Sequence, residues 1–334
     1  MRQFFRRHSA AKPFCISFIV VAYDMGREIP RTLQSLQAQY QHGSDHINYE
    51  VIVVDNGSPE PLDAANIQAF GSQFRLLRID DASPSPVPAI NMAAKQARGS
   101  HIAVVIDGAR ILSPGILHWS KQAFHLSQRA VVSVLGFHLG PAHQRLASEH
   151  GYHQALEDRL LASINWPHDG YRLFDIASLA GSSKYGWVAP LAESNCIVVP
   201  RTLYEEVGGY DEGFRSAGGG LANLDFYKRC CDAKDITLYH LFGEGCFHQI
   251  HGGVTTGGGA QVATRYHELT QEYAALRGEP HQPPQNTPVL LGEAQPGCLR
   301  LLSRGTRDYA TLRQVDEAFA QVMQQAGITL PPID

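Results

Sequence analysis

The feature that most constrains the fold is an apolar run that ends on an aspartate, residues 101–110 (HIAVVIDGAR). Residues 102–106 carry no polar side chain, which predicts a strand buried on both faces, in the middle of a parallel sheet. Ligands of such sheets bind beyond the carboxyl ends of the strands. Asp107 stands at that end, so it either binds a ligand, such as a metal ion or a sugar hydroxyl, or only closes a turn.

Two earlier strands are predicted to end in the same way. Residues 15–22 precede Asp24, and residues 49–54 precede Asp55. Strand–helix alternation with right-handed crossovers gives a doubly wound parallel sheet, so these carboxylates and Asp107 should line one crevice. The chain has neither GxGxxG after the first strand nor GxxxxGK[ST] anywhere, which argues against dinucleotide and P-loop phosphate binding.

The other predicted elements continue this alternation. We expect helices over residues 27–41, 88–97, 147–164, 201–207, 264–277 and 307–324, and strands over 74–79, 130–138 and 196–199. Residues 260–334, with a proline-rich stretch at 280–296, should form a C-terminal helical extension.

Composition narrows the class of protein. The net charge of -4, without a basic stripe, argues against nucleic-acid binding. Six scattered cysteines with no CxxC pair indicate a reducing compartment, and we expect a cytoplasmic protein. No stretch approaches the ~20 apolar residues of a membrane span, although peripheral membrane contact stays open. The short apolar run at 15–22 follows basic residues but lacks a cleavage site, so it predicts a strand rather than a signal peptide.

The first third of the chain carries a family resemblance. The block FIVVAYDMGREIPRTLQSLQAQ…YEVIVVDNGSPEP…NMAAKQARGSHIAVVIDGARILSPG resembles the nucleotide-sugar half of family 2 glycosyltransferases, which have the GT-A fold. The resemblance implies one α/β GT-A domain over residues 1–259, with a nucleotide-sugar half (14–115) and an acceptor half (116–259) that adds a small antiparallel part. It also implies a set of donor-binding residues, namely Ala22, Tyr23, Asp24, Asp55, Asn91 and Asp107.

The resemblance also implies a metal site, and here the chain departs from the pattern. Asp107 matches the first carboxylate of the DxD motif that holds Mn²⁺ or Mg²⁺ against the diphosphate, but Ala109 replaces the last. Hard cations need several oxygen ligands. Either another residue completes the site, or phosphates and water hold the metal, or no metal is used. We expect His251, with His248 as second candidate, to supply an imidazole ligand, although both could simply pack in a loop.

The predicted catalytic residues lie in AGGGLANLDFYKRC, residues 217–230, which resembles the family's glycine-rich GGEDxD segment. Asn223 stands where inverting members carry the general base. Because an amide cannot accept a proton, Asn223 would orient the acceptor hydroxyl. Asp225 is the remaining acid, and it is either the base or one half of a buried ion pair with Arg229 at i+4.

The resemblance therefore implies a glycosyltransferase, of the kind that builds polysaccharides. It would move a sugar from a nucleoside diphosphate, preferably a UDP-sugar, to a hydroxyl of a glycan or lipid-linked acceptor, with inversion and metal assistance. One alternative is a non-catalytic nucleotide-sugar-binding protein, since two positions that usually carry charge are neutral. A sugar nucleotidyltransferase is disfavoured because residues 23–28 (YDMGRE) form no glycine-rich triphosphate loop.

Overall fold

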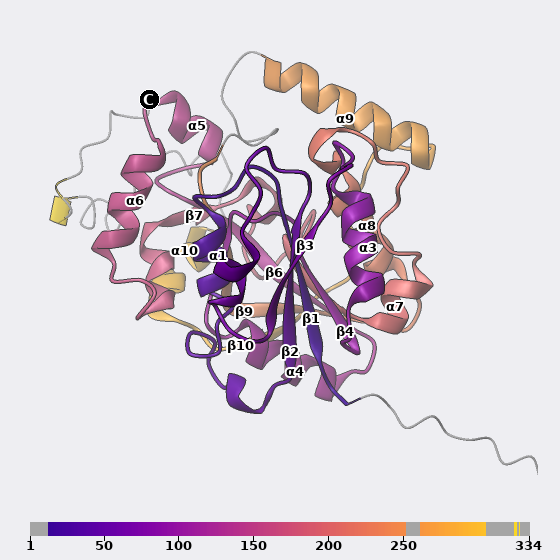
Figure 1. The fold of residues 1–334 in the computed structure, drawn as a ribbon, viewed down its shortest axis with the longest axis horizontal. Helices are drawn as coiled ribbons and strands as arrows, with labels where there is room; N and C mark the ends of the chain where they lie inside the picture. Colours follow the sequence, from indigo (N-terminus) through magenta and orange to yellow (C-terminus); the bar gives the residue numbers. More distant parts are fainter. Residues whose placement is uncertain (1–12, 252–260, 305–323, 326, 328–334) are drawn as a thin grey trace, which may run out of the picture.

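A computed structural model describes residues 13–251, 261–304, 324–325 and 327. One mixed sheet runs through this part of the chain in the order β10-β9-β6-β8-β4-β1-β2-β3, with β5 added to β9 and β7 to β6 (Figure 1). The strands are β1 Ile16–Ala22, β2 Tyr49–Asp55, β3 Phe74–Arg78, β4 His101–Val105, β5 Arg110–Leu112, β6 Ala130–Leu139, β7 Ala177–Leu179, β8 Cys196–Pro200, β9 Thr237–His248 and β10 Val289–Gly292.

Helices cover both faces of this sheet. They are α1 Ile29–Gln34, α2 Ala64–Gln68, α3 Val87–Gln96, α4 Ile116–Leu126, α5 Gln144–Glu149, α6 Gln154–Ser163, α7 Arg201–Glu206, α8 Ala222–Asp232, α9 Gln261–Arg277 and α10 Pro296–Arg304, with 3₁₀ turns at Ser44–His46, Gly170–Ile176, Gly181–Ser183 and Ala217–Gly219. Ile19 and Val21 of β1 pack into the core that includes α3, α7 and α8. Phe18 and Val20 point the other way, into the core beneath α1 and α4. Because alternate residues of a strand face opposite sides, β1 is buried on both faces, as expected.

The order and direction of the strands place the site. β3, β2, β1 and β4 are mutually parallel, and Ala22 lies beside Asp55 in the register. β8 runs antiparallel between β4 and β6, and β9 is parallel to β6. The α/β class is thus confirmed, as is the mostly parallel, doubly wound sheet with an antiparallel part expected of a GT-A type domain.

Two local predictions were wrong, and a strand inside the sheet was not predicted. Residues 147–164 form two helices, because Gly151 turns the chain with φ 87° between α5 and α6. The helix expected over 27–41 is α1 alone, which ends at Gln34. β9 was not predicted, since its sequence Gly243-Glu244-Gly245 reads as a loop, yet it lies inside the sheet.

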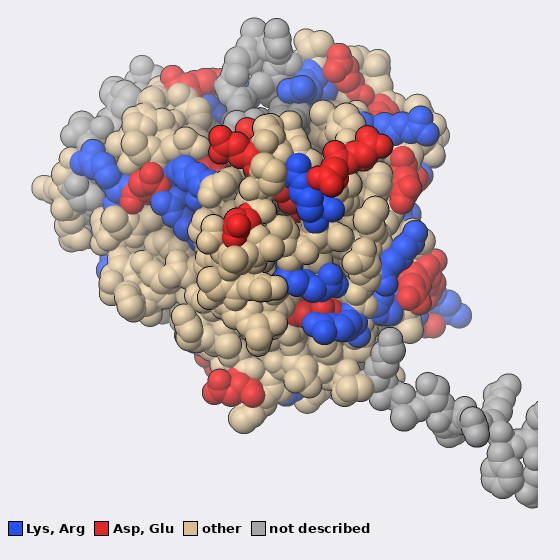
Figure 2. Space-filling model, viewed as in Figure 1, with Lys and Arg blue, Asp and Glu red and all other residues tan. Residues whose placement is uncertain are grey.

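The C-terminal extension packs on the domain. Its strand β10 pairs in parallel with β9, and α9 lies across the end of α8 (Figure 1). The helix expected over 307–324 falls almost wholly outside the described residues. None of the helices in the described part has the length and hydropathy needed to span a bilayer. Basic and acidic side chains are interspersed on the face seen in Figure 2, with no single-sign stripe.

Candidate functional site

Asp24 and Asp55 meet at the carboxyl edge of the sheet, but their environments differ. Asp24 is exposed, with φ 53°, and its N–H donates to Ser58 Oγ at 3.0 Å. Asp55 is fully buried: Oδ1 accepts from Ser58 N–H, and Oδ2 accepts from Leu62 N–H and from Arg78 at 2.6 Å. Burial alone would raise the pKa of Asp55, but these hydrogen bonds outweigh it and lower the pKa. Asp55 therefore organises the loop after β2, and both of its oxygens already have donors.

The other predicted donor-binding residues occupy contrasting places. Ala22 is buried at the end of β1, whereas the Tyr23 side chain is 55% exposed beside it. Asn91 accepts from the hydroxyl of Tyr204 at 2.8 Å and donates to the carbonyl of Tyr210 at 2.8 Å. These bonds tie α3 to α7 and to the loop after it. Tyr23 and Asp24 thus stay open to a ligand, while Asn91 is engaged within the fold.

Asp107 meets both candidate histidines. β5 pairs with β9 so that Arg110 lies opposite His248, which brings the end of β9 to the end of β4. The Nε2 atoms of His248 and His251 are 2.9 Å apart, and His248 Nε2 is 3.9 Å from Asp107 Oδ2. One ligand atom from each of the three residues lies within 4.8 Å of the others.

The chemistry of this cluster suits a metal ion. Burial lowers the pKa of His248 well below its ordinary value, and the Arg110 charge lowers it further. Burial also lowers the pKa of His251. Neutral imidazole is the form that ligates metals, and two imidazoles with one carboxylate form a donor set for Mn²⁺ and related transition metals.

Residue 109, where the motif has its second carboxylate, is an alanine that points into the core. Its side chain is fully buried in the apolar core with Leu112, on the α1 and α4 side of the sheet. Its carbonyl accepts from the N–H of Gln249 at 2.8 Å, which anchors the segment that carries His251. Position 109 therefore faces the core, and the histidines reach Asp107 from β9 instead.

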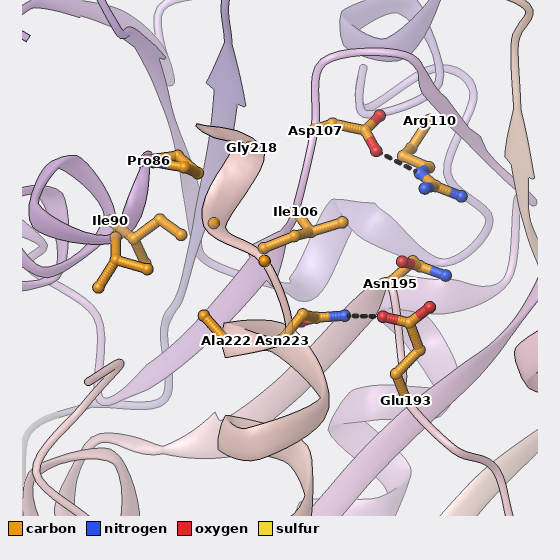
Figure 3. Close-up of a pocket in the computed structure, with 13 residues that line it drawn as sticks. Pro86, Ile90, Ile106, Asp107, Arg110, Glu193, Asn195, Gly218, Ala222 and Asn223 are labelled. Carbon is orange, nitrogen blue, oxygen red and sulfur yellow. Dashed lines mark hydrogen bonds and ion pairs between the residues drawn. The ribbon is translucent and has the colours of Figure 1, made fainter. Parts of the chain in front are cut away.

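Beside the cluster lies a pocket of about 160 Å³ (Figure 3). It opens between the start of α3, the end of β4, the loop before β8 and the glycine-rich loop before α8. Its lining consists of Pro86, Val87, Ile90, Ile106, Asp107, Arg110, Glu193, Asn195, Gly218, Gly219, Gly220, Ala222 and Asn223. The pocket thus shares Asp107 with the metal-type cluster.

Arg110 is the cationic group of this pocket. It is only 9% exposed, and its Nε donates to Asp107 Oδ2 at 2.8 Å. In the described part of the chain, no hydrogen bond reaches its other guanidinium nitrogens. Burial alone would lower the pKa of Arg110, but the Asp107 carboxylate more than offsets this and raises it. A buried, charged guanidinium with open donors is a binding group for carboxylates and phosphates.

Asn223 lies in the pocket and hydrogen-bonds an acid, Glu193, that no sequence motif marks. Its Nδ2 donates to Glu193 Oε2 at 2.7 Å and to the Ser194 carbonyl at 3.2 Å. Its Oδ1 accepts from the Tyr210 hydroxyl at 3.1 Å. Glu193 is half-buried and lines the pocket (Figure 3). It follows a loop and shows no motif of its own, so only its three-dimensional contact with Asn223 reveals it.

Asp225 has a structural environment. It is 1% exposed and is not among the residues that line the pocket. Its Oδ2 accepts from Arg229 at 2.7 Å and from Arg277 at 2.8 Å, and its Oδ1 accepts from Arg277 at 2.6 Å. Arg277 also bonds Asp211 at 2.7 Å. The ion pair with Arg229 is therefore present, and Asp225 joins α8 to α9 with both oxygens occupied, an environment that does not suit the base.

Part of the chain resembles a known protein family. Residues 17–168 match the model of a family described as glycosyl transferase family 2, and this segment includes Asp24, Asp55 and Asp107. No curated protein sequence matches the chain.

Solved structures also match. S. aureus TarS is 16% identical, with a TM-score of 0.47, over 78% of this chain and 39% of the TarS chain. TarS 1-349 in complex with UDP-GlcNAc is 14% identical, over 93% of this chain and 72% of that one, with a TM-score of 0.46. The mannosyltransferase PcManGT from Pyrobaculum calidifontis, in complex with GDP-Man and Mn²⁺, is 15% identical over 93% and 72%, with a TM-score of 0.44. This chain thus spans less than half of the full TarS chain. Residues 17–168, just under half of this chain, are thus similar to glycosyl transferase family 2.

Proposed function

We propose that this protein transfers a sugar from a nucleoside diphosphate to an acceptor hydroxyl in the pocket at the end of β4. The observation that carries the proposal is that Asp107, His248 and His251 meet beside the open guanidinium of Arg110. A departing diphosphate develops negative charge, and fixed cations at that point lower the barrier. The site offers two places for positive charge, a metal position and an arginine, on one side of the pocket.

The three residues fit a divalent cation, and we propose Mn²⁺ rather than Mg²⁺. Imidazole nitrogen suits Mn²⁺, whereas Mg²⁺ prefers oxygen ligands and keeps its waters. When bound, the cation would supply Lewis-acid stabilisation of the diphosphate. Asp107 would hold both the metal and Arg110, because its Oδ2 already accepts from Arg110 Nε.

We also propose a donor, an acceptor and a cellular compartment. The family resemblance favours a UDP-sugar as donor, a glycan or lipid-linked hydroxyl as acceptor, and inversion at the anomeric carbon. The six cysteines are all free, which supports a reducing, cytoplasmic compartment.

Calorimetry tests the donor site. UDP and GDP are titrated into the wild type with and without Mn²⁺, and into Asp107→Asn and His251→Ala variants. The asparagine keeps an oxygen for the Ala109 N–H and removes the charge. We expect one nucleotide to bind at least tenfold more tightly with Mn²⁺, and both variants to lose most of that gain. His125→Ala, an exposed histidine of α4, is the matched control and should bind like the wild type.

The outcomes separate three situations. Nucleotide binding that ignores Mn²⁺ would refute the metal site and leave the donor site to Arg110. Absence of binding by either nucleotide would refute the donor site itself. Binding without release of nucleotide from any sugar nucleotide would favour the non-catalytic binding protein, for which the neutral positions 109 and 223 are the supporting observation.

A further inference from the structure

One acid of the pocket has no part in the metal-type cluster. Among the described residues that line the pocket, Asp107 and Glu193 are the carboxylates. Asp107 accepts from Arg110 and from the Ala109 N–H. Figure 3 shows the joined pair of Asp107 and Arg110 on one side of the pocket, and Glu193 joined to Asn223 on another. Glu193 is therefore the acid that is left to act on a bound substrate.

We propose that Glu193 is the general base that removes the proton from the acceptor hydroxyl, a role that rests on the proposed sugar transfer. A base must be oriented and must keep an open lone pair. Asn223 orients the carboxylate through its 2.7 Å bond to Oε2. Within the described part of the chain, no hydrogen bond reaches Oε1, so this oxygen can accept the proton.

Asn223 acts here as a positioning residue. Its amide cannot take a proton, but its two ends are fixed by Tyr210 and by the Ser194 carbonyl. Asn223, an uncharged residue of α8, thus fixes the orientation of the Glu193 carboxylate. Asp225, two residues further along α8, has both oxygens bonded to arginines and cannot replace Glu193.

The glycine-rich loop forms one wall of the pocket. Gly218, Gly219 and Gly220 form one wall with φ of 74°, 83° and 55°, a left-handed run that suits glycine. A Cβ on Gly219 would lie 3.3 Å from Pro86 Cδ, so a side chain at this position would crowd Pro86. The absence of side chains here lets a sugar approach the backbone between Arg110 and Glu193.

Glu193 Oε1 accepts the hydroxyl proton, and the hydroxyl oxygen forms the new bond to the anomeric carbon. The bond from that carbon to the diphosphate oxygen breaks, and its electron pair leaves with the nucleoside diphosphate. Arg110 meets the charge that develops on this leaving group.

The test uses nucleophiles that differ in their need for a base. UDP-glucose, UDP-N-acetylglucosamine and GDP-mannose are supplied with water alone or with sodium azide, and nucleotide release is measured. Azide is an anion without a proton to lose. We expect Glu193→Gln to release nucleotide at least a hundredfold more slowly in water. Azide-dependent release should stay within threefold of the wild type, and the Kd for the nucleotide within twofold. Glutamine keeps an oxygen for Asn223.

Glu205→Gln is the matched control, because Glu205 is exposed on α7 and does not line the pocket. It should behave as the wild type with both nucleophiles. If Glu193→Gln hydrolyses at the wild-type rate, or loses the water and azide reactions equally, Glu193 is not the base and the sugar transfer itself still stands. If the wild type binds the nucleotides but releases none from any of the three donors, the proposed function fails and the base assignment fails with it.

Discussion

Replacing Asp225 by asparagine should cost the protein stability and leave its chemistry intact. The asparagine keeps one acceptor oxygen, so it loses the two bonds that Arg229 and Arg277 make to Oδ2. Hydrogen bonds to charged groups contribute about 1.5–3 kcal/mol each, which gives a gross loss of about 3–6 kcal/mol. The two arginine side chains are 26% and 25% exposed, so water replaces part of this. We expect a loss of about 2–4 kcal/mol in the free energy of unfolding, near the usual cost of breaking a buried ion pair.

Urea unfolding followed by circular dichroism measures this change, with nucleotide release assayed well below the transition. Asp232→Asn is the matched control on the same helix, because Asp232 is 49% exposed and, among the residues that the structure describes, pairs only with Lys228. Exposed pairs of this kind contribute little, so the control should stay within about 0.5 kcal/mol of the wild type. An Asp225→Asn variant with wild-type stability and a hundredfold slower release would refute the structural role of Asp225. It would return the base to α8 and remove the reason for assigning it to Glu193.

Three further predictions concern metal, anion and pH. Mn²⁺ should bind at least tenfold more tightly than Mg²⁺, and His248→Ala should remove most of this preference in calorimetric titration; equal affinities would contradict imidazole ligation. Arg110→Met should weaken binding of the nucleoside diphosphate about tenfold to a hundredfold and leave binding of the nucleoside unchanged, and equal losses for both would contradict a diphosphate contact. Burial lowers the pKa of His101 from 6.5 to about 4. Between these two pH values the unfolded chain binds a proton on His101, whereas the folded chain leaves His101 neutral. The free energy of unfolding therefore falls as the pH drops from 6.5 toward 4. His101→Phe, between Phe14 and Phe124, should make that fall shallower in urea unfolding at pH 7 and pH 5, and an unchanged slope would refute it.

The parts of the fold that could be predicted depend on local patterns. Largely apolar runs identified β1, β2 and β4, because strands buried on both faces consist mainly of apolar residues. β9 escaped prediction because Glu244 interrupts it between glycines. That carboxylate is fully buried, and it accepts from the Tyr171 hydroxyl and the Gly115 N–H, which are distant in the sequence. Hydrogen bonds from residues distant in the sequence compensate for the burial of this carboxylate, and its sequence neighbours give no sign of them.

In the candidate site too, local sequence patterns identified some residues correctly as candidates and could not show the partners of others. Asp107 could be selected from the sequence as a candidate ligand because it follows a predicted strand. His248 and His251 could be selected because they lie three residues apart before paired glycines. Asp55 and Asn91 have the right residue types, yet partners elsewhere in the chain already satisfy them. Arg78, for example, reaches Asp55 from 23 residues away. Residue type shows which side chains can bind a substrate, and only the packed structure shows which still have an unused donor or acceptor.

Unused hydrogen-bonding capacity therefore separates the residues that we propose to be reactive from the structural ones. A charged group whose hydrogen-bonding atoms are not all satisfied is costly to bury, so a chain keeps one where something outside the fold completes it. Arg110 is 9% exposed with a single bonded partner, and Glu193 bonds through only one oxygen in the described part of the chain. The two lie on different walls of one pocket and have opposite charge. Their complement is a ligand pair with an anionic group at one end and a hydroxyl proton at the other. A nucleoside-diphosphate sugar and an acceptor alcohol supply these two groups with the reacting carbon between them.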